Sequence, residues 1–490
     1  MSNRTVIHVL GHLLIFLAFI LCIPAIVAHM LDAPADFHAF LKAAFCSLIV
    51  GVLFRLNTSK HNLKFSVKEG FAIVTFGWVL LSFFGSLPYI FTHIEGYQFN
   101  LTDAFFETMS GLTTTGASII PKVENLPKGL LLWRSLTHWI GGMGVIVLFL
   151  AILPALGAGG FQLFRAEIPG PSKDKLSPKI ANTAKTLWGL YFLLTILCGF
   201  SLSLAGMSIF DSVCHAFGTI ATGGFSTHSE SIGGYNNWQY NAIITIFMFL
   251  SGCNFILFIQ LIKGRIGVIY HNEELRLYIV MITGSIAIIS AMLYYDGAYT
   301  GSITNILNHT CFQVVCIITS TGYATTDYDM WPLACQFILI LLMFTGACAG
   351  STGGGIKVFR VLIALKIAQR EIRQLLHPRA VLPLNIDGES ISEALLRVIL
   401  GFVSIFILLL GFFIFILAFI EGDRFNLTSL FSICVSCLSN IGPGLDQFGP
   451  TDNYAKLHDS SKWILSFMML LGRLELYSVL VIFKKDIWTH

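Results

Sequence analysis

The sequence has 490 residues, of which 55% are hydrophobic and only 12% are charged, and its mean hydropathy is +0.76. Soluble domains carry about 25% charged residues, so this composition excludes an ordinary soluble protein and indicates one that uses lipid as its solvent. The net charge of +3 is too small to suggest a nucleic-acid partner.

Ten apolar segments are long enough to cross the hydrocarbon core of a bilayer, which takes about 20 residues. In chain order they are 5–30, 38–57, 70–93, 134–156, 186–207, 238–262, 277–295, 333–370, 394–420 and 462–483. The first segment has no small-residue cleavage site, so we expect a retained span rather than a signal peptide.

Lysine and arginine gather in every second connection between these segments. They are Arg55, Lys60, Lys64 and Lys68, then Arg165, Lys173, Lys175, Lys179 and Lys185, then Lys263, Arg265 and Arg276, then Lys366, Arg370, Arg373 and Arg379, and finally Lys484 and Lys485. The alternate connections hold several acids, among them Asp32, Asp36, Asp327, Asp329, Asp446 and Asp452. By the positive-inside rule, both termini are expected to be cytoplasmic, which an even number of spans allows.

The eleven cysteines are scattered mostly through apolar segments, where free cysteine behaves as a small hydrophobic residue. Cys434 and Cys437 have CxxC spacing, but no second pair or nearby histidines accompany them. We therefore expect these two residues to serve packing rather than metal binding or redox chemistry.

Four short stretches of small polar residues and glycine interrupt the apolar pattern. They read TTTGAS at 113–118, ATGGFST at 221–227, TSTGYATT at 319–326 and SNIGPGL at 439–445. Each follows an apolar segment that is too short to span a bilayer, namely 103–113, 211–220, 307–319 and 429–439. The tetrapeptide FNLT occurs at 99–102 and 425–428, and its offset of 326 equals that between Gly116 and Gly442. The chain therefore contains an internal repeat.

Each repeat consists of a span, a short re-entrant helix, a polar strand and a second span. Two spans per repeat bring every copy into the membrane from the same side, so the copies pack around an axis along the membrane normal. The sequence thus predicts an all-α polytopic membrane protein with four parallel repeats around a central pore and two extra N-terminal spans. The expected divisions are 1–68 for the extra spans, then 69–160, 161–265, 266–378 and 379–490 for the four pore repeats.

The repeats have the chemistry of a cation path. The short helices start with Asp103, Asp211 and Ser429, which are good N-cap residues. Their C-terminal ends carry partial negative charge and would point toward the pore. The strands after them offer carbonyl and hydroxyl oxygens that can replace an ion's hydration shell. Any one stretch alone could instead be a polar loop outside the membrane.

The predicted ion ligands are three consecutive residues in each of the four strands. They are Thr114, Thr115, Gly116, Ala221, Thr222, Gly223, Ser320, Thr321, Gly322, Asn440, Ile441 and Gly442.

The eighth apolar segment is too long for one span and is broken by GACAGSTGGG at 346–355. A helix loses about 1 kcal/mol for each glycine relative to alanine, so we expect this stretch to unwind beneath the strands and to form a movable gate. The predicted gate residues are Gly346, Gly350, Ser351, Thr352, Gly353, Gly354, Gly355, Lys357 and Arg473. A phosphate-binding loop is rejected because lysine does not directly follow the last glycine and no strand precedes it. Close helix packing remains the alternative.

Arg473 lies near the middle of the last apolar segment. A charge at that depth usually faces the bundle interior or a water-filled path, so we expect a fixed positive barrier below the strands. A salt bridge is the alternative, although Glu475 is two residues away and should point elsewhere on a helix. We interpret His138 and His215 as hydrogen-bonded packing residues. Close packing is enough to explain the three glycines of the inner helices, Gly142, Gly252 and Gly472.

Together these segments resemble the Trk/Ktr/HKT superfamily of potassium transporters and, within it, the TrkH family of bacterial membrane subunits. Further similar motifs are HWIGGMGVIVLFLAILP at 138–154, GSTGGGIKVFR at 350–360 and LLGRLE at 470–475. The resemblance maps the family's filter glycines onto Gly116, Gly223, Gly322 and Gly442, and glycine at all four positions implies potassium selectivity. Each strand has a single matching glycine rather than a TVGYG run, which suggests fewer ion sites than in potassium channels.

The resemblance also implies a gating role for 346–355, a homodimer in the bacterial inner membrane, and a cytosolic nucleotide-binding partner of the TrkA type. The chain itself shows no nucleotide-binding fold, and we expect potassium as its transported ligand and no cofactor. Coupled symport of potassium with sodium or protons is the main alternative, and the lack of a mid-span acid counts against it. A membrane enzyme is not expected, because the sequence shows neither a catalytic cluster nor a sizeable soluble domain.

Overall fold

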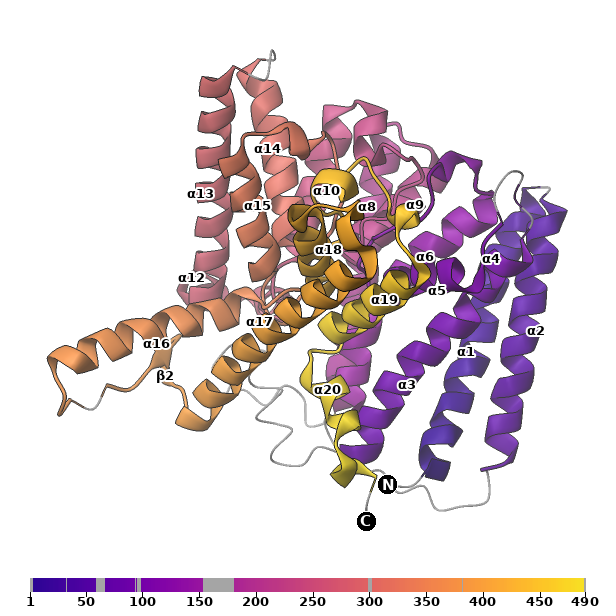
Figure 1. Ribbon diagram of the computed structural model, residues 1–490, viewed down its shortest axis with the longest axis horizontal. Coiled ribbons are helices and arrows are strands. Elements are labelled where there is room, and N and C mark those ends of the chain that lie inside the picture. The colour runs from indigo at the N-terminus through magenta and orange to yellow at the C-terminus, as the bar shows by residue number, and fades with distance from the viewer. Residues whose placement is uncertain are drawn as a thin grey trace.

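The protein is almost entirely helical. The computed structural model describes residues 3–31, 33–58, 67–92, 94, 98–152, 180–297, 302–380 and 382–488. Within these ranges the strands are β1 (Asn385–Ile386) and β2 (Glu389–Ser390), which pair antiparallel in a small hairpin. Most of the long helices run along a common direction, and both ends of the chain lie on one face (Figure 1). This architecture confirms the predicted all-α polytopic membrane fold.

The first two helices form a hairpin at one edge of the molecule (Figure 1). They are α1 (Asn3–Met30) and α2 (Pro34–Leu56). A Cβ built on Gly11 of α1 would lie 2.8 Å from the carbonyl oxygen of Gly51 in α2, and one on Gly51 would lie 2.9 Å from the carbonyl oxygen of Gly11. These facing glycines let the two backbones approach closely, as is common in lipid, where small residues mark helix interfaces.

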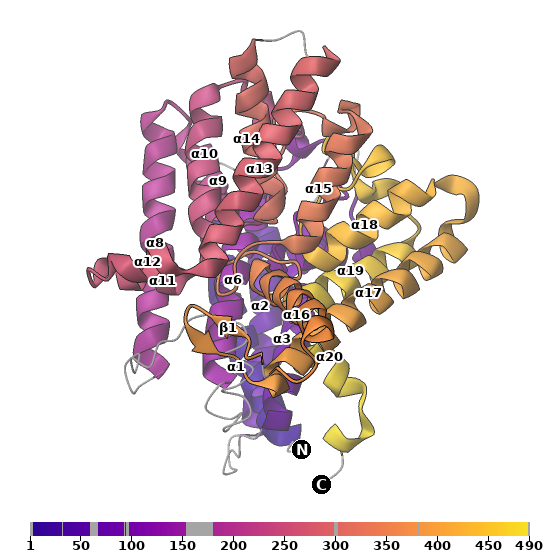
Figure 2. The same cartoon turned by 90° about the vertical axis from the view of Figure 1, so that its left-hand side faces the viewer.

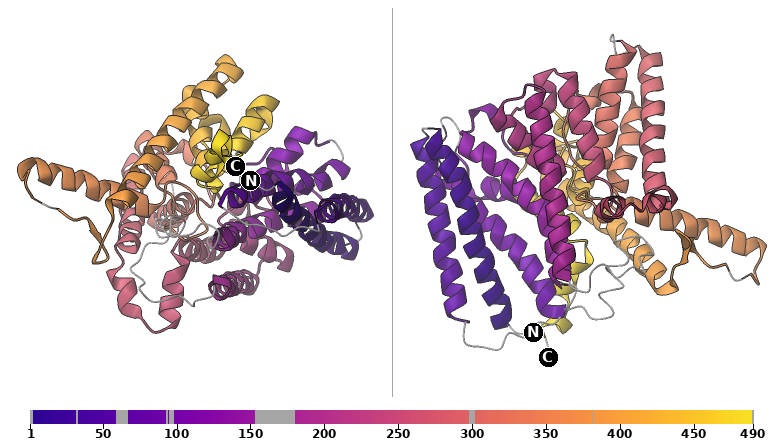
Figure 3. Two further views of the ribbon diagram at one scale, coloured as in Figure 1. Left: turned by 90° about the horizontal axis from the view of Figure 1, so that it is seen from below. Right: turned by 180° about the vertical axis from the view of Figure 1, so that it is seen from behind.

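The rest of the chain contains one arrangement four times, and the copies surround a common centre when viewed from below (Figure 3, left). We number them units 1 to 4. Unit 1 contains α3 (Val67–Gly85), α4 (Leu87–Phe91), α5 (Leu101–Leu112) and α6 (Lys128–Ile152), and unit 2 contains α8 (Ile180–Leu204), α9 (Ile209–Ile220), α10 (Trp238–Ser251) and α11 (Phe255–Ile262), followed by α12 (Ile266–His271). Unit 3 contains α13 (Glu273–Asp296), α14 (Ile303–Ile318), α15 (Leu333–Thr345) and α16 (Val358–Leu376). Unit 4 contains α17 (Glu393–Glu421), α18 (Leu427–Ser439), α19 (Asp459–Arg473) and α20 (Tyr477–Leu480).

Short 3-10 turns occur in the connections. They cover Val123–Asn125, Ser231–Tyr235, Tyr328–Met330, Gly422–Arg424, Asp446–Phe448, Tyr454–Lys456, Val481–Phe483 and Lys485–Ile487. Residues 153–179 lie outside the described residues, and so do Lys60, Lys64 and the basic residues from Arg165 to Lys179.

The predicted spans need two corrections. In the described part of the chain, six helices are long and apolar enough to cross a membrane, or up to eight if each of two bent pairs counts as one span. The segments 238–262 and 462–483 were expected to be continuous, but the structure bends the first by 91° between α10 and α11 and the second by 112° after α19. Figure 2 shows α11 and α12 running across the end of α10. The predicted break in 333–370 is confirmed, because α15 ends at Thr345 and α16 begins at Val358.

The four short helices α5, α9, α14 and α18 match the predicted re-entrant segments, and we call them the pore helices. The predicted N-caps at Asp103, Asp211 and Ser429 lie three residues C-terminal to the caps in the structure. The caps are Asn100, Ser208, Ser302 and Asn426. The side chains of Asn100 and Ser208 accept the backbone N–H groups of Asp103 and Asp211. An acid in the first turn is itself favoured by the helix dipole, so its presence does not locate the cap.

The eleven cysteines are all free, and Cys434 and Cys437 are buried in α18. This agrees with the interpretation of the CxxC pair as packing residues. Among the described residues, no group of three or more His, Cys, Asp and Glu side chains could hold a metal ion.

Candidate functional site

The four pore helices are followed by turns of one shared backbone conformation. The second residue of each turn is a non-glycine in the left-handed region, with φ of 53° at Thr114, 53° at Thr222, 56° at Ser320 and 55° at Asn440. The residue after it donates its N–H to a carbonyl oxygen five residues back, as in Thr115 to Ser110 at 2.9 Å and Gly223 to Gly218 at 2.8 Å. A glycine with positive φ follows in every turn. Four copies of one backbone device therefore face the centre of the molecule.

The position of this glycine corrects the predicted register of unit 2. The left-handed glycines are Gly116 (φ 81°), Gly224 (φ 82°), Gly322 (φ 85°) and Gly442 (φ 106°). Gly223 instead occupies the position of Thr115, Thr321 and Ile441, so the predicted equivalence of Gly223 with Gly116 is wrong by one residue. The sequence ATGGFS offers two adjacent glycines, and only their backbone dihedrals tell them apart.

The four glycines lie against one another's units in a closed ring. A Cβ on Gly116 would lie 2.1 Å from the carbonyl oxygen of Gly223, one on Gly224 would lie 2.0 Å from that of Thr321, one on Gly322 would lie 2.0 Å from that of Ile441, and one on Gly442 would lie 2.6 Å from that of Thr115. Each unit thus presents one carbonyl oxygen to the glycine of another unit, and the fourth contact returns to the first. We call the carbonyl groups of Thr115, Gly223, Thr321 and Ile441 the carbonyl ring. A ring of this kind can replace the hydration shell of a cation.

His138 of α6 fills the space behind unit 2. Its Nδ1 lies 2.8 Å from the carbonyl oxygen of Gly111, and its Nε2 accepts the backbone N–H of Phe225 at 3.1 Å. A Cβ on Gly223 would lie 2.4 Å from the His138 ring. His215 is likewise bonded at both ring nitrogens, to the carbonyl of Asp211 and the hydroxyl of Ser226. The interpretation of both histidines as hydrogen-bonded packing residues is confirmed.

A buried ion pair behind the ring was missed by sequence reasoning. Glu107 of α5 and Arg134 of α6 are 0% and 2% exposed, and Arg134 Nε lies 2.9 Å from Glu107 Oε1. Arg134 also donates to the carbonyl of Ser226 at 3.1 Å, and its guanidinium lies 4.1 Å from the centre of the Phe225 ring. Glu107 accepts the backbone N–H of Ile119 at 3.0 Å. We call the extended polar segment that follows each pore helix the strand of its unit, although none of these segments is paired in a β-sheet. The ion pair therefore joins the strand of unit 1 to the strand of unit 2.

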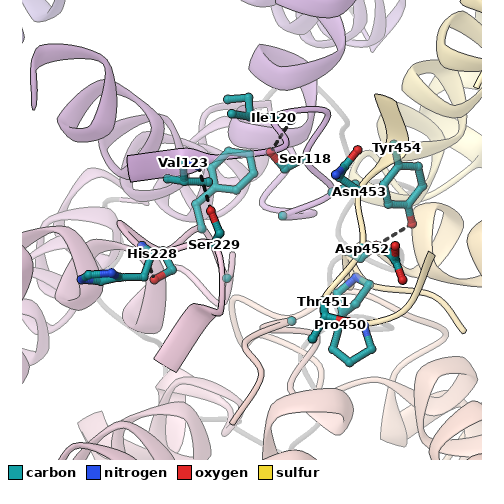
Figure 4. Close-up of a pocket in the computed structure, with 18 of the residues that line it drawn as sticks. Ser118, Ile120, Val123, His228, Ser229, Pro450, Thr451, Asp452, Asn453 and Tyr454 are labelled. Carbon is teal, nitrogen blue, oxygen red and sulfur yellow. Dashed lines mark hydrogen bonds between the residues drawn. The ribbon is translucent and has the colours of Figure 1, made fainter. Parts of the chain in front are cut away.

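A pocket lies beside the ring and is lined by all four left-handed glycines. Its walls come from the segments that follow them, including 117–123, 225–229 and 449–454. In the close-up, His228 and Ser229 lie on one side of the pocket, and Asp452, Asn453 and Tyr454 lie on the other (Figure 4). The pocket gives the ring an open approach from this side.

Asp329, in the turn Tyr328–Met330, lies behind one wall of this pocket, since a Cβ on Gly449 would lie 1.8 Å from its Oδ2. Burial, together with the nearby carboxylates of Asp327, Asp446 and Asp452, raises the pKa of Asp329 to about 7. Because the pKa is raised on folding, this carboxyl lowers stability progressively as the pH rises from about 4 through 7.

Replacing Asp329 with asparagine should therefore raise the thermal unfolding temperature in detergent, on the order of 2 °C at pH 8 and much less at pH 5. The asparagine keeps an acceptor but carries no charge. The exposed Asp423, changed in the same way, is the control and should show no such pH dependence. An equal shift at both pH values would contradict the ionisation of Asp329 as the cause.

On the other side of the ring, residues 346–357 form an irregular loop, which we call the intramembrane loop. The hydroxyl of Thr352 lies 3.1 Å from the carbonyl oxygen of Ile220, the last residue of α9. The N–H of Gly354 donates to the hydroxyl of Ser320 at 2.6 Å. A Cβ on Gly354 would lie 2.2 Å from the carbonyl oxygen of Ser439. Ser351, Thr352, Gly353 and Gly354 are all buried. The loop therefore lies directly against the pore-helix ends of units 2, 3 and 4.

Arg473 connects this loop to unit 1. It donates to the carbonyl of Thr352 at 2.8 Å and to the carbonyl of Gly141 in α6 at 3.2 Å. Arg473 is the last residue of α19, so it lies at the bend rather than in the middle of a continuous helix as predicted. Arg473 is only 5% exposed, and its bond to Thr352 places its guanidinium on the loop side of the ring.

The end of the loop is fixed by a second set of charges. Lys357, with φ of 78°, precedes α16, and its Nζ lies 2.9 Å from Glu475 Oε1. Arg360 donates to Glu475 Oε2 at 2.6 Å. The expectation that Glu475 points elsewhere than toward Arg473 is thus confirmed, since its carboxylate pairs with Lys357 and Arg360.

The three inner-helix glycines pack as interpreted. A Cβ on Gly142 would lie 2.9 Å from Cα of Ala221, one on Gly252 would lie 2.7 Å from Cγ2 of Thr319, and one on Gly472 would lie 2.2 Å from the carbonyl oxygen of Leu438. Each glycine therefore lets an inner helix approach the end of a pore helix.

The chain matches the TrkH family, described as cation transport protein, over residues 37–488. It is 41% identical to the Trk system potassium uptake protein TrkH of Escherichia coli (strain K12) over 492 residues, which cover 100% of each chain. It is 37% identical to the Trk system potassium uptake protein TrkG of the same organism, over 99% of this chain and 98% of that one. Among solved structures, it superposes on the potassium transporter TrkH from Vibrio parahaemolyticus with a TM-score of 0.89 and 35% identity, over 100% of each chain.

Proposed function

This chain belongs to the TrkH family of cation transport proteins, and from this membership we propose that it takes up potassium through the carbonyl ring. The observation that carries the proposal is the closed sequence of four contacts in which each left-handed glycine meets a carbonyl oxygen of another unit. The relatives with the highest identity reported above are named potassium uptake proteins. The chain is a multi-pass membrane protein, and we place it in the bacterial inner membrane with both termini in the cytoplasm.

We propose that the ion ligands are the predicted strand residues, with Gly224 added as the left-handed glycine of unit 2. The carbonyl groups of Thr115, Gly223, Thr321 and Ile441 supply the central level. Some predicted hydroxyl ligands are engaged elsewhere, since Ser320 Oγ accepts from the intramembrane loop and Thr222 Oγ1 donates to Thr352 Oγ1 at 3.2 Å. We therefore assign ion contact mainly to carbonyl oxygens.

We propose that the intramembrane loop is the gate. It lies against the pore-helix ends of units 2, 3 and 4, and Arg473 ties it to unit 1. Its glycines Gly346, Gly350 and Gly355 have positive φ, which is a conformation that an α-helix through this segment could not contain. Moving the loop aside would open the side of the ring opposite the pocket.

We also propose that the chain is divided at 1–68, 69–160, 161–265, 266–378 and 379–490, that it forms a homodimer, and that it docks a cytosolic nucleotide-binding subunit of the TrkA type. The relatives' names place them in a Trk system, which supports additional components. Helix α16 and the hairpin β1–β2 project beyond the bundle and offer a surface for such contacts (Figure 1).

The proposal predicts that the purified chain in proteoliposomes passes potassium in preference to sodium, driven by the potassium gradient alone. In the Gly116→Ser variant this preference should fall at least about tenfold, which corresponds to roughly 1.4 kcal/mol. The reason is that a Cβ at Gly116 would lie 2.1 Å from a ring carbonyl and that φ of 81° disfavours a side chain. The measurement is uptake of each ion under matched gradients.

Gly284→Ser is the matched control, because a Cβ on Gly284 in α13 meets nothing within 4 Å. It should transport as the wild type does. A requirement for a second driving ion would favour symport instead, and unchanged preference in Gly116→Ser would overturn the assignment of the carbonyl ring as the filter.

A further inference from the structure

The four carbonyl groups of the ring make the same kind of contact in every unit. The carbonyl groups of the four left-handed glycines, one residue later in each unit, do not, and we call these four groups the glycine level. The hydroxyl of Tyr454 donates to the carbonyl oxygen of Gly442 at 2.6 Å. Within the described part of the chain, no hydrogen bond is recorded to the carbonyl oxygens of Gly116, Gly224 or Gly322. One of four equivalent acceptors is thus occupied by the protein.

The backbone of unit 4 differs at the same residue. The φ of Gly442 is 106°, whereas Gly116, Gly224 and Gly322 have φ of 81°, 82° and 85°. A Cβ on Gly442 would lie 2.6 Å from its ring carbonyl, whereas the other three distances are 2.0 to 2.1 Å. The φ angle and the distance to the ring carbonyl therefore both differ in unit 4, the unit whose glycine carbonyl Tyr454 contacts.

Tyr454 is held firmly in place. Its backbone N–H donates to the carbonyl of Ser118, in the strand of unit 1, at 2.9 Å. Its ring packs between Phe106 and Phe448, with centroids 5.7 and 5.3 Å away, and the residue is only 2% exposed. Figure 4 shows the side chain at the wall of the pocket. The hydroxyl is therefore positioned by both neighbouring units rather than free to leave the carbonyl.

A carbonyl oxygen that accepts a hydroxyl proton has less negative charge to offer a cation. Discrimination between potassium and sodium depends on the number and field strength of the coordinating carbonyl dipoles. We propose that Tyr454 determines the specificity of the proposed potassium path, because its hydroxyl weakens one of the four carbonyl ligands at the glycine level. This inference rests on the proposed function and adds an asymmetric outer site to it.

The test compares Tyr454→Phe with wild type in proteoliposomes, using potassium, rubidium and sodium. Removing the hydroxyl should restore a fourth full ligand, so the potassium concentration for half-maximal uptake should fall about three- to tenfold, with a matching rise in preference over sodium. Tyr328→Phe is the matched control. Its hydroxyl is also buried and donates to a strand carbonyl of unit 4, that of Gly444 at 3.2 Å, which lies two residues beyond the glycine level. It should leave both quantities unchanged.

A second variant keeps the inference testable if the phenylalanine form does not fold. Tyr454 replaced by 3,5-difluorotyrosine keeps the ring but makes the hydroxyl a stronger donor, so half-saturation should move to higher potassium. Unchanged ion preference in Tyr454→Phe, or equal shifts in Tyr328→Phe, would overturn the role of Tyr454 while wild-type potassium flux still supports the carbonyl ring. Absence of selective flux in wild type would instead overturn the proposed function.

Discussion

Arg473→Ala is expected to raise rubidium uptake by the isolated chain at least about tenfold. Arg473 ties the intramembrane loop to unit 1 through the carbonyls of Thr352 and Gly141. A hydrogen bond from a charged group contributes roughly 1.5–3 kcal/mol, so losing two of them shifts the loop toward the open position by more than one order of magnitude. Removing a buried positive charge beneath the ring also lowers the barrier to a cation. Tracer uptake into proteoliposomes without any partner protein measures the change.

Arg473→Lys separates the tether from the charge. Lysine keeps the positive charge, but it cannot reproduce the planar, two-armed donation of arginine. If the tether holds the gate, this variant should conduct at an intermediate rate. If the charge alone limits flux, it should conduct as wild type. Arg424→Ala, at an exposed arginine outside the loop, is the control and should be unchanged. Uptake by Arg473→Ala at or below the wild-type rate would show that the loop contacts do not close the path.

The pore helices were the most predictable part of the fold. The segments 103–113, 211–220, 307–319 and 429–439 became α5 (Leu101–Leu112), α9 (Ile209–Ile220), α14 (Ile303–Ile318) and α18 (Leu427–Ser439). Short apolar runs bounded by polar residues have few alternatives in a membrane, because backbone groups at that depth must be satisfied internally. The glycine-rich break in 333–370 was predictable for a related reason, since glycine weakens a helix wherever it lies.

The break between α10 and α11 was not predictable from apolar composition. FILFIQLI, which forms α11, is as apolar as the helix before it. The bend is stabilised by distant residues, since Cys348 donates its N–H to the carbonyl of Gly252 at 3.0 Å and Phe255 donates to that of Gly350 at 3.2 Å. The backbone groups freed by the break are thus satisfied by the intramembrane loop. Hydropathy reports contact with lipid, and it contains no information about such tertiary partners.

Within the candidate site, composition alone predicted the strands and the intramembrane loop. It did not predict the Glu107–Arg134 ion pair that holds two of the strands in place. Glu107 lies in a predicted pore helix, and Arg134 lies at the start of a predicted span, so both were visible as charges in apolar surroundings. Their pairing required knowing that α5 and α6 pack face to face. Buried ionisable residues at membrane depth are functional candidates by default, and the same rule that selected Arg473 would have selected this pair.

The Glu107–Arg134 pair should contribute strongly to both stability and potassium preference. Arg134→Met should destabilise the protein by about 3–5 kcal/mol, because it leaves the carboxylate of Glu107 buried without its partner. It should also reduce potassium preference, since the carbonyl of Ser226 and the hydroxyl of Ser118 lose the donor that joins the strands of units 1 and 2. Thermal unfolding in detergent and ion uptake in proteoliposomes measure the two effects separately.

The double variant Glu107→Gln with Arg134→Met tests whether the pair positions the filter or only balances charge. It buries no unpaired charge, so most of the lost stability should return, whereas the strand contacts from Arg134 stay absent and potassium preference should remain low. The buried pair Asp103–Lys462, with Lys462 Nζ 2.6 Å from Asp103 Oδ1, joins α5 to α19 and provides the comparison. Asp103→Asn with Lys462→Met should leave potassium preference intact. Recovery of both stability and preference in the Glu107–Arg134 double variant would reduce that pair to charge compensation, because only a positioning role requires the arginine itself.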